Sequence, residues 1–317
     1  MSRKVVVLGG GTGLSCLLKG LKEYNVSITA IVSVCDDGKS TGRLREEFNQ
    51  VAVGDIRRVL VALSETEPMF EELLNYRFHT SSDLNGHTVG NLLLTAMTNI
   101  TGNMNKGIKS LGKVLNLKGN VIPLSEDNSI TLMGEMEDGE IVEGEHNITE
   151  KHKKIKRVFY KNEPIVSRDA IKAIKEADLI VLSMGSIYTS IIPNLICKDI
   201  IEAIDKSNAN IMYVCNIVTQ PGETDDFKAS DHINLLNSYL GKKKISVGIF
   251  NHEEMSPELV KKYETEEQKD PVILDKENLK NIEIIEDDLI SDKDGTFRHD
   301  TLRLGLDIFT YLLNHRK

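Results

Sequence analysis

The chain has 317 residues, of which 39 are basic and 48 are acidic, so its formal net charge at pH 7 is −9. A general nucleic-acid-binding protein needs a basic footprint, and this balance excludes that class while leaving room for a local nucleotide site. Hydrophobic residues make up 40% of the chain and charged residues 27%, which predicts a sizeable core rather than disorder. No stretch approaches the ~20 apolar residues of a membrane span.

The cysteines Cys16, Cys35, Cys197 and Cys215 are scattered, with no C-x-x-C pair. This spacing predicts neither a disulfide framework nor a zinc site and is typical of a reducing compartment. The apolar residues near the N-terminus are interrupted at Gly9, and no small-residue cleavage site follows, so we expect no signal peptide. The sequence therefore predicts a cytoplasmic protein without membrane insertion.

Apolar runs of strand length alternate with segments of helical spacing in the first part of the chain. Such alternation is typical of βαβ units and a parallel sheet. We expect strands at residues 4–8 and 28–34 and helices at residues 14–21, 56–64, 69–78, 88–100 and 108–115.

The pattern changes at about residues 118–160, where the apolar segments 120–124, 130–135 and 140–143 are short. Asp138 and Gly139 form a hairpin turn signal, so we interpret this region, including the basic run at 151–157, as an antiparallel excursion. The alternation then resumes, with strands expected at 179–182, 211–214 and 245–249 and helices at 196–204, 233–240, 258–268 and 302–313.

No linker rich in proline, serine or glycine divides the chain. We therefore expect one α/β domain over residues 1–317 instead of two domains. The predicted fold class is a three-layer, Rossmann-like α/β fold whose mostly parallel sheet carries an antiparallel insertion.

A glycine-rich turn at residues 9–13 lies between the first strand and the first helix. Glycines let the backbone approach a phosphate closely, and the N-terminus of a helix is partly positive. The strict dinucleotide spacing G-x-G-x-x-G is absent because residue 14 is leucine, which weakens an NAD-type interpretation. The other interpretation is a tight structural turn. The candidate phosphate contacts here are Gly10, Gly11, Thr12 and Gly13.

A second polar loop at residues 36–43 follows the second strand. It resembles the end of a P-loop, but residue 33 is serine where that motif needs glycine, so we exclude a P-loop NTPase. Asp36 and Asp37 either hold a divalent cation such as Mg²⁺, which in turn holds a diphosphate, or bind ribose hydroxyls. An exposed polar turn is the third interpretation. Lys39, Ser40 and Arg43 complete the candidate contacts of this loop.

Further polar residues stand near the ends of other elements. Asp55 either caps the helix that follows it or faces the ligand. Asn91 is a candidate donor to a ligand oxygen, whereas His87 is more typical of a turn residue than of a catalyst. Two loops after later strands are suited to reading a base or a sugar, and they contribute Gly185, Ser186, Tyr188 and Thr189, and Asn216, Thr219, Gln220 and Glu223.

Ligands of open α/β sheets bind outside the carboxyl ends of the strands, so the four loops are expected to face one crevice. The sequence contains no G-x-S-x-G elbow, no H-E-x-x-H pair and no EF-hand loop. These patterns together favour a ligand-binding protein over one with a recognisable catalytic constellation.

These loops, in this order, resemble the bacterial gluconeogenesis factor (YvcK-like) family, which is related to the 2-phospho-L-lactate transferases (CofD-like). The resemblance runs over residues 4–313 and departs after the 54–57 motif, where the family has asparagine and this chain has Arg58. The motifs that carry it are Gly-Gly-Gly-Thr-Gly at 9–13, Asp-Asp-Gly at 36–38, Gly-Arg-Leu-Arg at 42–45, Gly-Asp-Ile-Arg at 54–57, Gly-His-Thr-Val-Gly-Asn-Leu at 86–92, Gly-Ser-Ile-Tyr-Thr-Ser-Ile-Ile-Pro-Asn-Leu at 185–195 and Cys-Asn-Ile-Val-Thr-Gln-Pro-Gly-Glu-Thr at 215–224.

The resemblance implies a CofD-like fold and a cytoplasmic, homo-oligomeric protein that binds a uridine-diphosphate sugar. It also implies a role in growth on gluconeogenic carbon sources and in cell shape, with cell-wall synthesis or regulatory proteins as partners. The alternatives are a CofD-like transferase acting on a nucleotide-activated substrate and an NAD-binding protein. Thr301 follows Arg298 by three residues and is either a kinase site or, like Asp300, a cap of the last helix.

Overall fold

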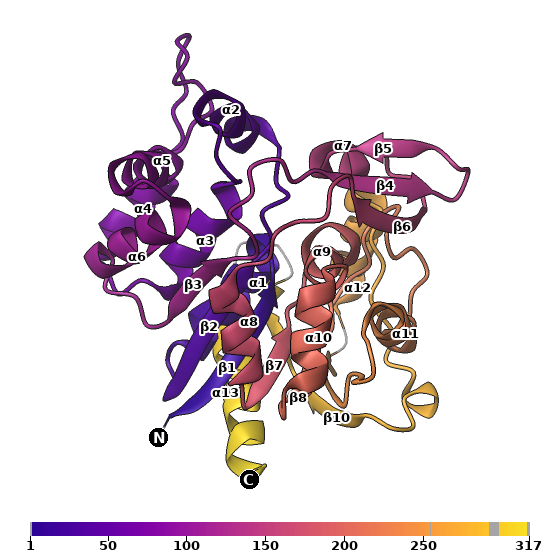
Figure 1. Ribbon diagram of the computed structural model, residues 1–317. Helices are drawn as coiled ribbons and strands as arrows, with labels where there is room; N and C mark the ends of the chain where they lie inside the picture. The colour runs from indigo at the N-terminus through magenta and orange to yellow at the C-terminus, as the bar shows by residue number, and fades with distance from the viewer. Residues whose placement is uncertain (1, 254, 292–297, 316–317) are drawn as a thin grey trace.

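A computed structural model describes residues 2–253, 255–291 and 298–315 of the chain. Within these residues, seven strands form one parallel sheet in the order β10-β9-β8-β7-β1-β2-β3 (Figure 1). Their bounds are β1 Arg3–Gly9, β2 Val26–Val32, β3 Asn120–Pro123, β7 Leu179–Leu182, β8 Asn210–Val214, β9 Val247–Asn251 and β10 Glu283–Asp287.

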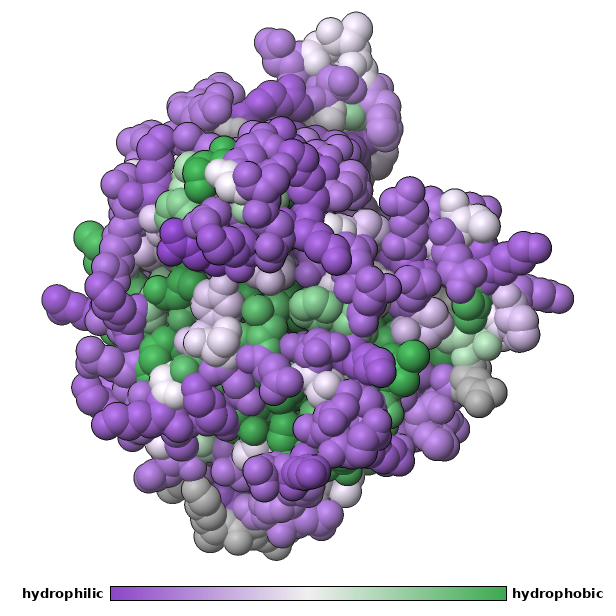
Figure 2. All heavy atoms as spheres, turned by 90° about the vertical axis from the view of Figure 1, so that its right-hand side faces the viewer, coloured by the Kyte–Doolittle hydropathy of each residue, from purple (hydrophilic) through white to green (hydrophobic). Residues whose placement is uncertain are grey.

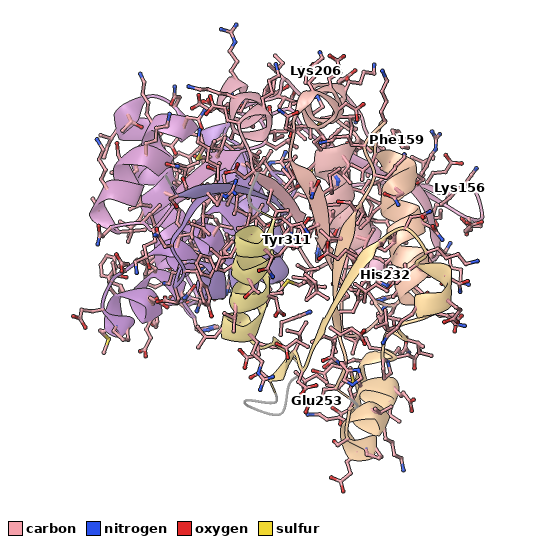
Figure 3. The ribbon with its side chains drawn as sticks, turned by 90° about the horizontal axis from the view of Figure 1, so that it is seen from below. Lys156, Phe159, Lys206, His232, Glu253 and Tyr311 are labelled. Carbon is pink, nitrogen blue, oxygen red and sulfur yellow. The ribbon has the colours of Figure 1, made fainter. Side chains whose placement is uncertain are left out.

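Helices cover both faces of the sheet, which confirms the predicted three-layer α/β fold. Seen from below (Figure 3), the helix that carries Tyr311 lies on the opposite side of the sheet from the helix that ends at Lys206. One face carries α1 Gly11–Leu21, α3 Gly54–Leu63 and α13 Thr301–Asn314, and the other carries α6 Met104–Val114, α8 Arg168–Lys175 and α10 Lys198–Lys206.

The central strands are apolar because helices bury them from both sides. All four residues of β7 are buried, as are the last five of β1. In α1 the buried leucines Leu14, Leu17, Leu18 and Leu21 recur at helical spacing and form the stripe that packs inward. The other face of α1 packs against α13 so closely that a Cβ added at Gly20 would lie 1.5 Å from the carbonyl oxygen of Thr301.

The helices between β2 and β3 form a group on the left of Figure 1, with α2 at its top, beyond the carboxyl ends of the strands. It contains α2 Lys39–Phe48, α4 Pro68–Asn75 and α5 Val89–Thr101, together with α3 and α6. The polar loop expected at 36–43 is shorter than predicted, because α2 begins within it at Lys39. The helix α2 could not be predicted from hydrophobic periodicity, because it is rich in acidic and basic residues and few apolar residues mark its buried face.

The antiparallel insertion is present, and its strands β4 Leu132–Met136, β5 Ile141–Glu143 and β6 Ile155–Tyr160 pair in the order β5-β4-β6. Gly139 in the connecting turn has a φ of 85°, as the hairpin signal predicts. A short helix, α7 Glu145–Glu150, joins β5 to β6. The strand expected at residues 120–124 is present as β3, but its assignment to the antiparallel excursion was wrong. β3 pairs in parallel with β2 at the edge of the main sheet, so the insertion begins later.

The sequence analysis did not predict α8 or β10, whose residues are mostly charged. The helix expected at 258–268 is present as α12 Pro257–Lys262, continued by a π-helical turn, η2 Tyr263–Glu267. The remaining elements are the π-helical turn η1 Ile187–Ile191, α9 Ile192–Leu195, α11 Ala229–Tyr239, the 3₁₀ turn η3 Lys276–Asn278, β11 Ile290–Ser291 and β12 Arg298–His299.

Hydrophilic residues cover most of the face shown in Figure 2, and apolar residues reach the surface in its middle. Among the residues that the structure describes, no helix combines the length and the apolar character needed to cross a membrane.

Candidate functional site

The four loops singled out in the sequence follow β8, β7, β1 and β2, which are neighbours in the sheet. Because all four strands are parallel, their carboxyl ends meet at one edge, and hydrogen bonds connect the loops. The Asn216 side chain joins the β8 loop to the β7 loop through two 2.8 Å bonds with the backbone of Gly185. The structure therefore brings these loops together at one edge of the sheet, and the remaining question is which side chains are free to bind a ligand there.

The glycine-rich turn has the backbone that its sequence predicts. Gly11 has a φ of 62°, in the region that favours glycine, and Gly10 is extended. However, the Gly11 N–H already donates to Asp55 Oδ2 at 2.7 Å, so a carboxylate occupies one of the groups expected to bind phosphate. Gly13 is needed for packing, because a Cβ there would lie 2.0 Å from the carbonyl oxygen of Met184. Thr12 is exposed and remains free for a ligand.

Asp55 links this turn to α3. It does not cap its own helix: one carboxylate oxygen accepts from Gly11 and the other accepts from Arg58 Nη1 at 2.9 Å. Burial, followed by the nearby charge of Asp36, raises the pKa of Asp55 to about 6, although Arg58 opposes this shift. Asp55 thus positions the glycine-rich turn, and the N-cap interpretation was wrong.

The two aspartates of the second loop bind backbone N–H groups. Asp36 Oδ1 accepts from Gly38 at 3.0 Å, and Asp37 Oδ1 accepts from His146 at 2.9 Å. The second bond ties the insertion to the main sheet, and it needs Gly144, where an added Cβ would lie 2.4 Å from Asp37 Oδ2. The observed role of Asp37 is therefore to hold the first turn of α7.

Two other candidates from this loop region lie inside the protein. Ser40 and Asn91 are 3% exposed, and Ser40 Oγ binds His87 Nδ1 at 2.9 Å and Asn91 Nδ2 at 3.2 Å. A serine beside a histidine has the geometry of an activated nucleophile, but this serine is closed to a substrate. Lys39 and Arg43 are exposed instead, and Arg43 donates to the backbone of Asn85.

The later loops use most of their predicted contact residues to hold their own shape. Glu223 accepts from Ser186 Oγ and from the Tyr188 N–H, and burial raises its pKa. Tyr188 and Thr189 are each 4% exposed. Their assignment as contacts to a base or a sugar is not supported, because their side chains are buried.

The loop after β8 is held in the same way. Thr219 is 2% exposed, and its hydroxyl accepts from the Asp270 N–H at 2.9 Å. The Gln220 N–H donates to Thr224 Oγ1 at 2.9 Å. Asn216 and Gln220 are partly exposed as residues, but the Asn216 amide already bonds Gly185 with both of its polar atoms. The Gln220 Oε1 atom is buried and has no hydrogen-bond partner among the described residues, so Gln220 is the member of the loop with an unused polar atom.

Glu145 joins the crevice from α7, and the sequence analysis missed it. Burial and the charges of Asp36 and Asp55 raise the pKa of Glu145 to about 8, although a hydrogen bond from the Thr189 hydroxyl opposes the shift. No periodicity could reveal this residue, because the insertion places it beside Asp36, Asp55 and Thr189, which all lie on distant segments of the chain. Glu145 is thus mainly protonated at neutral pH.

The carboxylates do not form a ready metal site. Within residues 2–253, 255–291 and 298–315, no group of three or more His, Cys, Asp or Glu side chains is placed to hold a metal ion. Asp36 and Asp37 each already accept a backbone N–H. The magnesium interpretation of Asp36 and Asp37 stays a prediction.

A pocket of about 590 Å³ adjoins the exposed side of the glycine-rich turn. It lies between α1, α3 and the start of α13 and is lined by Thr12, Ser15, Cys16, Lys19, Arg58, Val61, Asn75, Ser291, Arg298, His299, Asp300, Thr301 and Leu302. Lys19, Arg58 and Arg298 supply its positive charge. Lys19 could have been found from the sequence, because Thr12, Ser15 and Lys19 share one face of α1 at helical spacing.

Burial raises the pKa of all four thiols, including Cys16, which is partly exposed and lines the pocket. Burial raises the pKa of Cys35 to about 11 and the pKa values of Cys197 and Cys215 to about 12. Since the thiolate is the nucleophile, these groups are inert at neutral pH. The geometry therefore describes a binding pocket beside a crevice and does not identify an exposed nucleophile.

The raised pKa of Glu145 makes a pH-dependent prediction. The folded state keeps a proton that the unfolded state releases above about pH 4.5, so this group makes the protein less stable as the pH rises toward 8. Glu145→Gln is expected to raise the free energy of unfolding at pH 8.5 by roughly 2 kcal/mol and to change it by less than about 1 kcal/mol at pH 5.

Urea denaturation at the two pH values measures this difference. Glu143→Gln is the control, because Glu143 is an exposed neighbour paired with Lys161. Equal free energies of unfolding of the two variants at pH 8.5 would show that Glu145 does not have the raised pKa in the folded protein.

Comparison with known proteins agrees with this architecture. Residues 5–290 match the family model described as 2-phospho-L-lactate transferase CofD. A gluconeogenesis factor of Halalkalibacterium halodurans is 47% identical over 308 residues, covering 96% of this chain and 94% of that protein, and one of Bacillus subtilis is 47% identical over 305 residues, covering 95% and 96%.

A crystal structure of a protein from Bacillus halodurans superposes with a TM-score of 0.93 and 46% identity. It covers 98% of this chain and 100% of that one. The chain therefore belongs to the CofD family, in its group of gluconeogenesis factors.

Proposed function

We propose that this protein is a cytoplasmic regulatory protein that binds a uridine-diphosphate sugar and is required for growth on gluconeogenic carbon sources. The observation that carries the proposal is the pocket beside the glycine-rich turn, which Lys19, Arg58 and Arg298 line together with the exposed Thr12. A diphosphate is a dianion that such a group of cations favours. The names of the relatives support the metabolic part, and the four free cysteines suit a reducing compartment.

The pocket has the dimensions of a small-molecule site, which is roughly 300–1,000 Å³. The diphosphate would lie against Thr12 and the three cations. Gln220, with its unpartnered Oε1 atom, is the proposed contact to the base or the sugar. The burial of Ser40 and the raised pKa of the buried Cys35 thiol support a regulatory role over a catalytic one. Cell-wall synthesis and regulatory proteins are the proposed partners, with assembly as a homo-oligomer.

A thermal-shift panel tests the ligand class. Ligand at a hundred times its dissociation constant should stabilise the protein by about 2.7 kcal/mol and raise its melting temperature by several degrees. We expect this shift with uridine-diphosphate glucose and uridine-diphosphate N-acetylglucosamine, and a smaller one with guanosine diphosphate. A shift with NAD and none with either sugar nucleotide would overturn the proposal.

A CofD-like transferase is the second candidate, and Glu145 is the observation that favours it. A carboxyl group with a pKa of about 8, beside Asp36 and Asp55, is able to donate a proton at neutral pH. Mass spectrometry of a uridine-diphosphate sugar incubated with the protein and Mg²⁺ separates the two functions. Intact ligand supports binding alone, whereas released uridine diphosphate supports the transferase.

Thr301, which the sequence offers as a phosphorylation site, lies at the start of α13 beside the pocket. Asp300 caps α13 by accepting from the N–H groups of Leu302 and Arg303, so Thr301 is not needed as the cap. Thr301 lines the pocket, and a negative charge there would compete with the diphosphate for its cations. Thr301→Glu is expected to weaken uridine-diphosphate-sugar binding at least tenfold in a calorimetric titration, roughly the effect of one charge-assisted contact. The control is Thr310→Glu, on an exposed position of the same helix.

Mass spectrometry of the protein isolated from growing cells tests whether Thr301 carries phosphate. An unmodified residue under all growth conditions would remove the regulatory role of this position.

A further inference from the structure

A second hollow of the described molecule has no part in the site above. It is a groove of about 860 Å³ between α6 and α8, over the amino-terminal halves of β1, β2 and β3. We propose that it is a second binding site, for an organic anion in which one carboxylate or phosphate monoester is joined to an apolar body. It shares no lining residue with the pocket beside the glycine-rich turn.

The floor of the groove is a strip of sheet that no helix covers. Lys4 and Val6 on β1 pair in register with Ser27 and Thr29 on β2, and Thr29 pairs with Asn120 on β3, so these residues share one face. Parallel sheets are normally covered on both faces. Figure 1 shows β1 and β2 in view between α6 and α8. The uncovered strip is therefore a place where the helical layer leaves room for a ligand.

Positive charge is in excess around this groove. Its lining holds Lys4, Lys109, Lys113 and Lys172 against Asp169 and Glu176, although the whole chain carries a net charge of −9. Lys109 on α6 pairs with Asp169 on α8 at 2.9 Å and joins the two walls. Glu176 is shared between Lys4 at 2.8 Å and Lys172 at 4.0 Å.

Lys113 is the lysine of the groove whose charge is not balanced by an ion pair among the described residues. The other three lysines of the groove each form one. It stands in the last turn of α6, at the rim of the groove. An anionic group of a ligand would complete the charge balance at this position.

The rest of the lining explains why the ligand needs an apolar body. Leu117 and Ala173 contribute partly exposed apolar surface, and the groove is also lined by Val6, Ile108 and Ile122, which are buried. A small inorganic anion would leave that surface in contact with water, whereas an apolar body would cover it. The charge of the rim and the character of the floor therefore select an amphipathic anion.

The dye 8-anilinonaphthalene-1-sulfonate, an aromatic anion, is a suitable probe, and its fluorescence reports binding. We expect decanoate and phenyl phosphate to displace it, while decanol and inorganic phosphate at the same concentrations do not. Decanol matches the chain of decanoate without the charge, and phosphate has the charge without the body. Displacement by decanol as strong as by decanoate would overturn the proposal, as would failure of both organic anions to displace the dye.

A matched pair of variants locates the binding. Lys113→Glu should weaken dye and decanoate binding at least tenfold, because a cation is replaced by a repelling charge. Lys106→Glu makes the same change of net charge on an exposed residue of α6 outside the groove, and it should change binding less than twofold. The thermal shift with uridine-diphosphate glucose should be the same in both variants, so this test does not depend on the proposed function. Dye binding that is equal in the two variants would show that the dye binds elsewhere and would refute the assignment.

Discussion

Replacing Arg58 by glutamine is expected to weaken uridine-diphosphate-sugar binding about tenfold to a hundredfold. Arg58 lines the pocket beside Thr12, and its ion pair with Asp55 at 2.9 Å holds the guanidinium in place. A hydrogen bond to a charged group contributes roughly 1.5–3 kcal/mol, which corresponds to that range of affinity. Calorimetric titration of the parent and the variant with uridine-diphosphate glucose measures the loss.

The control for this experiment is Arg157→Gln. Arg157 is exposed on the insertion and pairs with Glu135, so its loss changes the net charge equally without touching the pocket. If the Arg58→Gln protein binds the ligand as tightly as this control does, the diphosphate does not bind in the pocket, and the loops at the carboxyl ends of the strands become the proposed site. The same titrations at two salt concentrations should show a weaker salt dependence for Arg58→Gln than for the parent.

Replacing Gly20 by valine is expected to cost about 3 kcal/mol of stability or more. Replacing a glycine within a helix by another residue usually raises stability, because glycine is a poor helix former. Here an added Cβ would lie 1.5 Å from the carbonyl oxygen of Thr301, and backbone cannot move aside as a side chain can. The α1–α13 contact would have to open, and the midpoint of urea unfolding should fall accordingly.

Gly112→Val in α6 is the control, because the atom nearest to its added Cβ is the end of the flexible Leu117 side chain, at 2.8 Å. We expect a smaller loss of stability there. If the two variants unfold at the same urea concentration, the close approach of α1 and α13 does not determine the stability of this region.

The sequence predicted the α/β order, the antiparallel insertion and the edge of the sheet where the loops meet, because these features follow from local apolar patterns and turn residues. It could not place Glu145 or Arg298 at the site, because each is brought there by a segment far away in the chain. Both depend on tertiary contacts that no window of the sequence contains.

The sequence was less informative about the role of each polar residue. Asp37, Asn91 and Glu223 have the side chains expected of ligand contacts, but each is hydrogen-bonded to a group of the protein itself. A polar residue after a strand can bind a ligand or fix its own loop, and composition does not distinguish these roles. Side-chain exposure distinguishes the two roles: Thr12 is exposed and can bind a ligand, whereas Ser40 and Tyr188 are buried and fix the structure around them.

The close contact between Gly20 and Thr301 has a consequence for how the protein is made. During synthesis, α1 is made long before α13, the helix that covers its outer face, because Gly20 and Thr301 lie far apart in the chain. The pairing of β1 with β7 must likewise wait until Leu182 has been made. The segment formed by β1 and α1 therefore stays incompletely packed until α13 has been translated, and a chaperone that shields exposed apolar surface would be needed longest there.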